Sequence, residues 1–426
     1  MSQPRTGLWL IGARGGVAAT VILGLEALKK QRVGTVGLVS ALEEFQSLDF
    51  ALWDSFVVGG HEIRAGSLRD SLTRLSSESR VLDASLIEGC RSELAAVDER
   101  ICVGSLANCG STIAGLAGKT DNHADSESAQ DAIRRLQRDL RNFQTEAAVE
   151  RVIVINLAST EPAGDYSRLP ARWDDLARLL EDAATNSLPA SSLYAIAALD
   201  LGMPYINFTP SLGSSPPAIQ ELARLRGTCH AGQDGKTGET LLKSVLAPMF
   251  AARNLQILSW VGHNILGNMD GQALADPANK LAKIKGKDGL LGEILGYEPQ
   301  SLVSIEYIRS LGDWKTAWDH IHFRGFMGTP MVMQFTWQGC DSLLAAPLVL
   351  DLVRFVELSA RRGETGLLTH LASFFKQPLG TSDHDFSRQF SLLREWAAQS
   401  AAERGRDRES SSANAHEVRV PKQAPA

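Results

Sequence analysis

Two hydrophobic periodicities alternate along the first 240 residues of the chain. Residues 7–11 (GLWLI) and 151–158 (RVIVINLA) are apolar runs with the length of buried strands. The same pattern predicts further strands at 35–40 and 204–208, and helices at 17–30, 131–149 and 193–201. Strands that alternate with helices predict an α/β fold with a doubly wound parallel sheet.

The pattern changes after about residue 240. Four segments alternate apolar and polar residues with few helices between them: 255–261, 301–309, 318–324 and 330–337. This alternation predicts a second, mostly β layer with one face toward solvent. A long amphipathic helix begins at Asp341, and residues 401–426 contain almost no core residues and predict a disordered tail.

Composition and charge limit the class of protein. The 426 residues carry a formal net charge of -6, which argues against binding to nucleic acid. No apolar run approaches the roughly 18 residues of a membrane span, and the N-terminus lacks the pattern of a signal peptide. Five cysteines without a CxxC pair favour reduced thiols and a cytoplasmic location, with a zinc site at Cys102 and Cys109 as a poorly supported alternative.

A glycine-rich turn follows the first predicted strand. Gly12, Gly15 and Gly16 would let a pyrophosphate approach the backbone N–H groups at the start of the next helix. Arg14 stands where a glycine is usual, so an ordinary strand-to-helix turn remains an equal alternative. Glu43 and Glu44 are weak candidates for a contact with the ribose of a dinucleotide.

Two later loops have the composition of ligand-binding loops. Residues 231–240 (AGQDGKTGET) open a helix and offer backbone and hydroxyl donors to a phosphate, although a threonine that only caps the helix would look the same. Residues 263–271 (HNILGNMDG) are dense in amides and glycine, which could orient sugar hydroxyls or simply close a turn.

Four lysines are candidates for chemistry. Lys283 and Lys287 would share one face of a helix, Lys315 lies in GDWK, and Lys376 follows two phenylalanines. A partly buried lysine has a lowered pKa, and a charged one can stabilise an oxyanion or a phosphate. His320 and His322 could bind a metal, but a structural or exposed pair is the more common explanation, and no metal site is predicted.

An ordered set of motifs resembles the myo-inositol-1-phosphate synthase family over most of residues 7–380. The motifs are ASTEP at 158–162, GMPYIN at 202–207, GQDGKTGET at 232–240, HNILGNMDG at 263–271, GDWK at 312–315, CDSLLAAPL at 340–348 and FFKQPL at 374–379. The resemblance implies NAD-dependent cyclisation of glucose 6-phosphate to inositol phosphate. Its steps are oxidation at C5, enolisation, intramolecular aldol closure and re-reduction.

The resemblance also implies an architecture. Residues 1–240 and 343–400 would form a Rossmann-type NAD-binding domain, and residues 241–342 an inserted α+β domain for catalysis and tetramerisation. The implied partners are a small phosphosugar and three further copies of the chain, without nucleic acid or membrane. The implied cofactor is NAD, and a monovalent or divalent cation is left open.

Site residues carry over position by position from the family. The implied catalytic residues are Lys283, Lys287, Lys315, Lys376, Asp270 and Asp341. The implied NAD contacts are Gly12, Gly15, Gly16, Ser159, Asp234 and Asp341. The implied substrate contacts are Thr237, Gly238, Glu239, Thr240, Asn264, Leu266, Asn268 and Lys287.

Three positions depart from the family pattern. Arg14 replaces a glycine, Glu239 a more usual glutamine beside the phosphate, and Ile265 a frequent histidine. A carboxylate at 239 would repel phosphate unless only its backbone N–H is used. The alternatives to the cyclase are an enzyme for another sugar phosphate, an inactive NAD-binding scaffold, and a class I aldolase that uses a lysine Schiff base.

Overall fold

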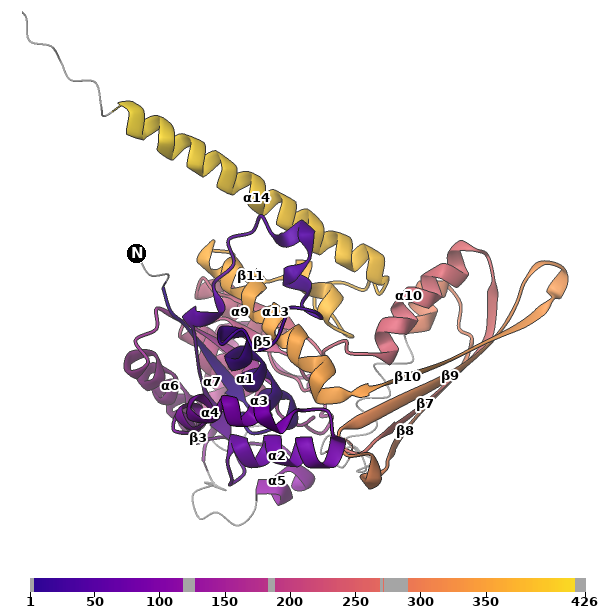
Figure 1. Cartoon of the computed structure of the whole chain (residues 1–426), viewed down its shortest axis with the longest axis horizontal. Helices are drawn as coiled ribbons and strands as arrows, with labels where there is room; N and C mark the ends of the chain where they lie inside the picture. Colours follow the sequence, from indigo (N-terminus) through magenta and orange to yellow (C-terminus); the bar gives the residue numbers. More distant parts are fainter. Residues whose placement is uncertain (1–3, 118–126, 183–187, 269–270, 272–289, 418–426) are drawn as a thin grey trace, which may run out of the picture.

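The larger of two sheets in the computed structural model has seven parallel strands. The structure describes residues 4–117, 127–182, 188–268, 271 and 290–417 (Figure 1). The strand order is β11–β6–β5–β4–β1–β2–β3. The strands are β1 (Thr6–Ile11), β2 (Phe56–Glu62), β3 (Ile101–Val103), β4 (Arg151–Asn156), β5 (Tyr205–Asn207), β6 (Cys229–Gly232) and β11 (Gly366–Leu367). The direction of winding reverses between β1 and β4, and in such sheets ligands bind at this point, outside the carboxyl ends of the strands.

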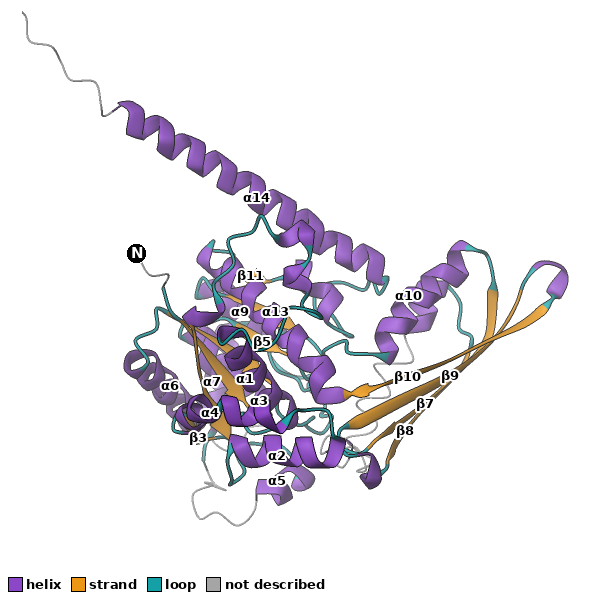
Figure 2. Cartoon of the chain, viewed as in Figure 1, coloured by secondary structure: helices purple, strands orange, loops and turns teal. Residues whose placement is uncertain are grey.

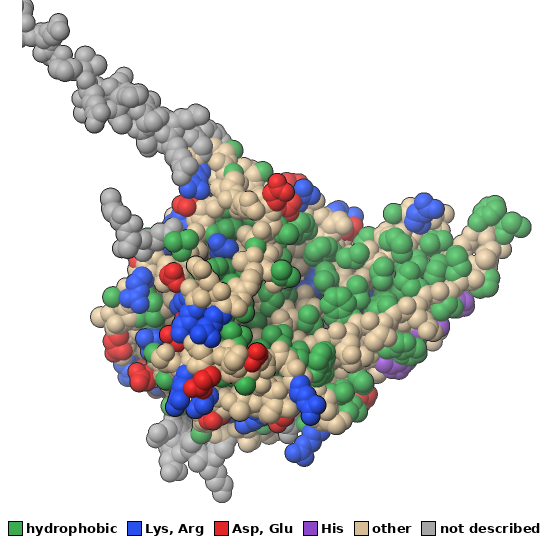
Figure 3. All heavy atoms as spheres, viewed as in Figure 1, with side chains coloured by type: hydrophobic (Ala, Val, Ile, Leu, Met, Phe, Trp, Pro, Cys, Tyr) green, Lys and Arg blue, Asp and Glu red, His purple; other side chains and the backbone are tan. Residues whose placement is uncertain are grey.

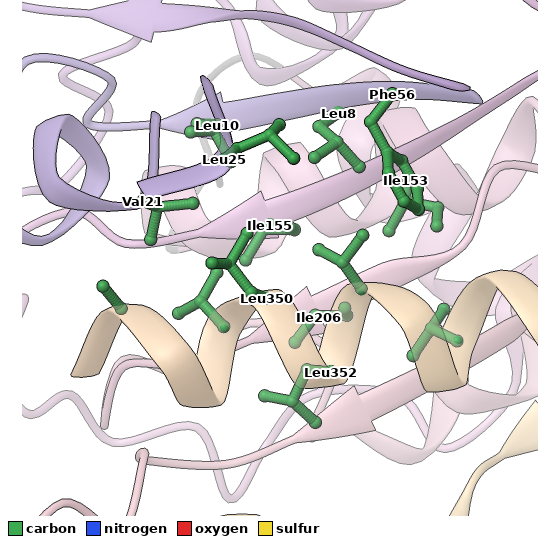
Figure 4. Packing of buried hydrophobic residues seen from close by; sticks show 14 of the residues in the cluster. Leu8, Leu10, Val21, Leu25, Phe56, Ile153, Ile155, Ile206, Leu350 and Leu352 are labelled. Carbon is green, nitrogen blue, oxygen red and sulfur yellow. The ribbon is translucent and has the colours of Figure 1, made fainter. Parts of the chain in front are cut away.

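Helices cover both faces of this sheet. One buried cluster joins the sheet to α1 (Gly16–Lys29), α13 (Asp341–Arg361) and the start of α14 (Phe386–Glu417), as Figure 4 shows for α1 and α13. A second cluster covers the opposite face with α6 (Ala129–Glu146), α7 (Trp173–Glu181), α8 (Ala190–Asp200) and α9 (Pro217–Leu225). Short helices α2 (Leu68–Ser79), α3 (Ala84–Gly89), α4 (Arg91–Asp98) and α5 (Ser111–Ala117) lie between β2 and α6 in the chain. The predicted doubly wound α/β fold is therefore confirmed.

The smaller sheet has four strands in the order β10–β9–β7–β8. They are β7 (Gln256–Leu266), β8 (Gln300–Tyr307), β9 (Trp314–Arg324) and β10 (Pro330–Cys340). Helix α10 (Glu239–Ala252) leads into this sheet and packs on one face through Phe250, which lies in a buried cluster with Trp260 and Ile321. The sheet projects to one side of the larger sheet (Figure 2), and β10 returns the chain directly into α13. The predicted second β layer is present, while the exact domain boundaries stay predictions.

The strand predicted at 35–40 is wrong. Residues 35–38 form a turn with Gly37 at a φ of 94°, and a short 3-10 helix starts at Val39. The second strand is β2, whose glycines are needed because a Cβ at Gly60 would lie 2.3 Å from the Leu10 carbonyl oxygen. Because of these glycines, the sequence of β2 looks only weakly apolar although every residue of the strand is buried.

The C-terminal helix extends beyond the predicted end of the folded region. Residues 401–417 continue α14, where the sequence predicts a disordered tail, and residues 418–426 lie outside the described part. Glu403 pairs with Arg362, and Arg404 lies 3.2 Å from Asp49. These ion pairs attach the helix to the body past residue 401. None of the described helices is long and apolar enough to cross a membrane.

Candidate active site

A cavity of about 1070 Å³ lies at the carboxyl ends of β1, β2 and β4, where the winding of the sheet reverses. The smaller sheet contributes residues near the ends of β7 and β8 and the start of β9. The predicted residues that line it are Gly12, Gly15, Gly16, Ser159, Asp234, Thr237, Asn268, Lys315, Asp341 and Lys376. Residues far apart in the sequence thus meet in one cavity.

The glycine turn after β1 lines the cavity. Gly12 donates its N–H to the His61 carbonyl oxygen (2.9 Å), has a φ of 79°, and lies so close to Ala158 that a Cβ would come within 3.0 Å of it. Gly15 precedes α1, and no side chain caps this helix N-terminus. The turn and the helix dipole therefore fit the pyrophosphate of a dinucleotide.

Glu62 is a site residue that sequence reasoning missed. It ends β2 beside the glycine turn, is 5% exposed, and accepts hydrogen bonds from Arg14 N (2.8 Å) and Ile63 N (2.9 Å). An acidic residue at the tip of the second strand is where a dinucleotide-binding fold holds the adenosine ribose. Glu43 and Glu44, the residues predicted for this contact, lie in a short 3-10 helix instead. They were candidates only because the second strand was predicted at 35–40 rather than at β2. The signal for Glu62 was the apolar run at 56–58 followed by two glycines and an acid.

Arg14 does not obstruct the turn. Its guanidinium group turns to Asp98, with Nε 2.8 Å from Oδ1, while its backbone N–H donates to Glu62. The side chain that replaces a glycine therefore leaves the backbone of the turn in place. Arg64 also pairs with Glu62 at 3.2 Å and covers part of its carboxylate.

Asp234 and Lys376 form a buried pair on the wall of the cavity. Lys376 Nζ donates to Asp234 Oδ1 at 2.8 Å, and the two residues are 8% and 7% exposed. Their backbones also pair, since Lys376 N donates to the Asp234 carbonyl oxygen. The cavity thus has a lysine held by a carboxylate beside the end of β6.

A second lysine–carboxylate pair lies where the two sheets meet. Lys315 Nζ is 3.7 Å from Asp341 Oδ1, and Asn268 Nδ2 is 3.4 Å from Asp341 Oδ2. Asp313 holds the chain on both sides of Asp341, because it accepts hydrogen bonds from Ser342 N (2.8 Å) and Cys340 Sγ (2.7 Å). Burial raises the pKa of Asp313 despite these hydrogen bonds.

The predicted phosphate loop opens α10 beside the cavity. Thr237 lines the cavity, while Glu239 and Thr240 are each 3% exposed in the first turn of the helix. The Glu239 carboxylate lies 2.9 Å from the ammonium group of Lys243, and both side chains are buried. The ion pair offsets the negative charge that would otherwise repel a phosphate at Gly238.

Several predicted residues lie elsewhere or outside the described chain. Asn264 and Leu266 belong to β7 rather than to a loop, are 1% and 3% exposed, and are not among the residues that line the cavity. Asp270, Lys283 and Lys287 lie outside the described residues. Within the described chain no group of three metal-ligating side chains occurs.

Comparison with known proteins decides the family. The NAD-binding family model described as myo-inositol-1-phosphate synthase matches residues 6–398. The chain belongs to the myo-inositol-1-phosphate synthase family. Among relatives of this family, inositol-3-phosphate synthase 1 of Bacteroides thetaiotaomicron is 31% identical over 92% of this chain and 93% of its own. Inositol-3-phosphate synthase 1 of Oryza sativa is 29% identical over 84% of this chain and 75% of its own.

Solved structures of the family share the fold. Inositol-3-phosphate synthase of Caenorhabditis elegans superposes with a TM-score of 0.82 at 24% identity, over 94% of this chain and 86% of its own. A myo-inositol-1-phosphate synthase-related protein of Thermotoga maritima gives a TM-score of 0.76 at 23% identity, over 92% of this chain and 98% of its own. The two-sheet architecture is therefore that of the myo-inositol-1-phosphate synthase family.

Proposed function

We propose that the chain catalyses the NAD-dependent cyclisation of D-glucose 6-phosphate to 1D-myo-inositol 3-phosphate. Family membership supports the reaction class, and one observation carries the proposal. The same cavity is lined by the glycine turn and by the Asp234–Lys376 and Lys315–Asp341 pairs. When bound, NAD would supply the acceptor for a hydride from C5 of the sugar and return it after ring closure.

The chain's own residues would hold the cofactor beside the glycine turn. Gly12, Gly15 and Gly16 admit the pyrophosphate, and Ser159 follows β4 on the same wall. Glu62 would accept hydrogen bonds from the adenosine ribose hydroxyls, which would replace part of its contact with Arg64. Asp234 pairs with Lys376 and Asp341 with Lys315, and both carboxylates would also contact NAD when it is bound.

The lysines hold and move protons in the same cavity. Lys376 acts in proton transfer at C5 and C6, because Asp234 fixes its position on the wall of the cavity. Lys315, which lines the cavity beside Asp341, stabilises the developing oxyanion. Asp270, Lys283 and Lys287, to which the family resemblance also assigns catalytic roles, lie outside the described residues.

The substrate phosphate binds at the start of α10. Thr237, Gly238 and Thr240 offer hydroxyl and backbone donors at the positive end of the helix dipole, and Asn268 lines the cavity just after β7. Glu239 takes part through its backbone N–H only, since its carboxylate pairs with Lys243.

A homotetramer assembled through residues 241–342 is part of the proposal. Large apolar side chains stand exposed on α10 and on the smaller sheet: Val245, Met249, Leu302, Trp318, Phe326, Met327 and Val332. Figure 3 shows apolar side chains gathered in the hollow between α10 and β10. An apolar surface of this kind is typical of a protein interface. We also infer a cytoplasmic location, which suits the five free cysteines.

Incubation with glucose 6-phosphate and NAD tests the function directly. The product, separated from substrate and identified by ¹H and ³¹P NMR, should be an inositol monophosphate. Conversion of a different sugar phosphate with glucose 6-phosphate untouched would replace the proposal by a related cyclase. An active chain trapped by borohydride with its substrate would instead indicate a Schiff-base aldolase.

A further inference from the structure

A second buried lysine lies directly behind the Asp234–Lys376 pair. Lys236 is 3% exposed and is not among the residues that line the cavity. Its Nζ donates to Gln389 Oε1 at 2.6 Å, in the first turn of α14, and lies 5.8 Å from the centre of the Phe386 ring. Its amine is therefore held by a neutral amide and an aromatic ring.

Backbone pairing fixes Lys236 next to Lys376. Gly235 and Phe375 form an antiparallel bridge, Lys236 N donates to the Phe374 carbonyl oxygen (2.8 Å), and Lys376 N donates to the Asp234 carbonyl oxygen (2.6 Å). Lys236 and Lys376 therefore lie diagonally across the same short ladder. The carboxylate of Asp234 accepts a hydrogen bond from Lys376. The second buried amine, that of Lys236, bonds Gln389 instead.

Among the described residues, the charge that acts on Lys236 is that of Lys376, and no carboxylate pairs with the Lys236 amine. Burial, and after it the charge of Lys376, lower the pKa of Lys236 to about 8. The other charged or titratable groups at the start of α14 and beside it are Asp383, His384, Asp385, Arg388 and Glu293. Asp383 and Asp385 are engaged by Arg388 and by backbone N–H groups, and His384 pairs with Glu293.

We propose that Lys236 is a positioning residue for Lys376, whose ammonium form it destabilises by like-charge repulsion, and that Gln389 holds Lys236 in place without neutralising it. The inference rests on the proposed catalytic role of Lys376. It links the C-terminal helix to the chemistry, because α14 supplies the neutral partner that leaves the charge of Lys236 uncompensated.

The pH dependence of kcat/KM for glucose 6-phosphate, measured with saturating NAD on the full-length protein, tests the proposal. Lys236→Met deletes the charge of Lys236, and Gln389→Glu pairs it with a carboxylate. Either change should raise the apparent pKa of the limb that reports Lys376 by on the order of one pH unit. Gln389→Met disturbs the same contact but keeps the charge, and should not move the limb upward. Lys30→Met, which loses a lysine 32% exposed at the end of α1, controls for net charge.

The outcomes separate this inference from the proposed function. A Lys376→Met variant that keeps near-wild-type kcat would remove the lysine mechanism itself. If Lys376→Met is inactive and Gln389→Glu leaves the limb unmoved, the catalytic role stands and the role of Lys236 is overturned. An equal upward shift in Gln389→Glu and Gln389→Met would show a structural effect and would also overturn it. If Lys236→Met fails to fold, the two Gln389 variants still decide.

Discussion

Replacement of Glu62 by glutamine should weaken NAD binding strongly. The carboxylate is almost fully buried at the tip of β2 and receives five donors within 3.2 Å, from Arg14, Ile63 and Arg64. Glutamine keeps the shape but loses the charge, and its amide nitrogen cannot accept from Arg14 N or from a ribose hydroxyl. A hydrogen bond to a charged group contributes about 1.5–3 kcal/mol, so the Kd for NADH should rise roughly 10- to 150-fold.

Cofactor selectivity gives a second readout of the same change. A carboxylate at this position repels the 2′-phosphate of NADPH, so Glu62→Gln should reduce the preference for NADH over NADPH. Isothermal titration with both dinucleotides measures the two Kd values. Glu88→Gln is the matched control, since Glu88 is exposed and pairs only with arginines on the surface among its described contacts. Unchanged Kd values for both dinucleotides in Glu62→Gln would refute the ribose assignment.

Three further predictions concern the substrate, the assembly and pH. Thr240→Val should raise KM for glucose 6-phosphate by roughly tenfold or more, because it removes a charge-assisted hydrogen bond; an unchanged KM would exclude the loop. Phe326 and Met327 are 89% and 88% exposed, and replacing both with serine should weaken the tetramer. Light scattering measures the assembly, and a monodisperse monomer of the wild-type chain would contradict it. Burial raises the pKa of Glu161 from 4.5 to about 7, so its contribution to stability is present below pH 4.5 and lost as pH rises to about 7. The unfolding free energy of wild type minus Glu161→Gln should fall over that window, and a flat difference would contradict the shifted pKa.

The sequence predicts the elements well where local periodicity is strong. The strands β1 and β4 and the helices α6 and α13 were evident because apolar residues repeat over whole elements. β2 was not, since Gly59 and Gly60 replace large apolar residues where Trp9 and the Leu10 backbone pack against the strand. Propensity alone therefore favoured the exposed segment at 35–40.

The site depends on contacts that local patterns cannot show. Asp234 and Lys376 are 142 residues apart, and the pairing of β6 with β11 and the bridge between Gly235 and Phe375 bring them together. Family resemblance supplied both residues without their geometry. Glu62 and Lys236 lie outside the positions carried over from the family, and the fold places both beside the site.

Turnover with a trace of NAD tests the central claim most directly. A fixed small amount of NAD is mixed with a large excess of glucose 6-phosphate, and both inositol phosphate and NADH are followed. The account predicts many molecules of inositol phosphate for each NAD, without accumulation of NADH, because the cofactor is reduced and reoxidised within one cycle. NADH that accumulates in proportion to product, or product that never exceeds the NAD supplied, would contradict it.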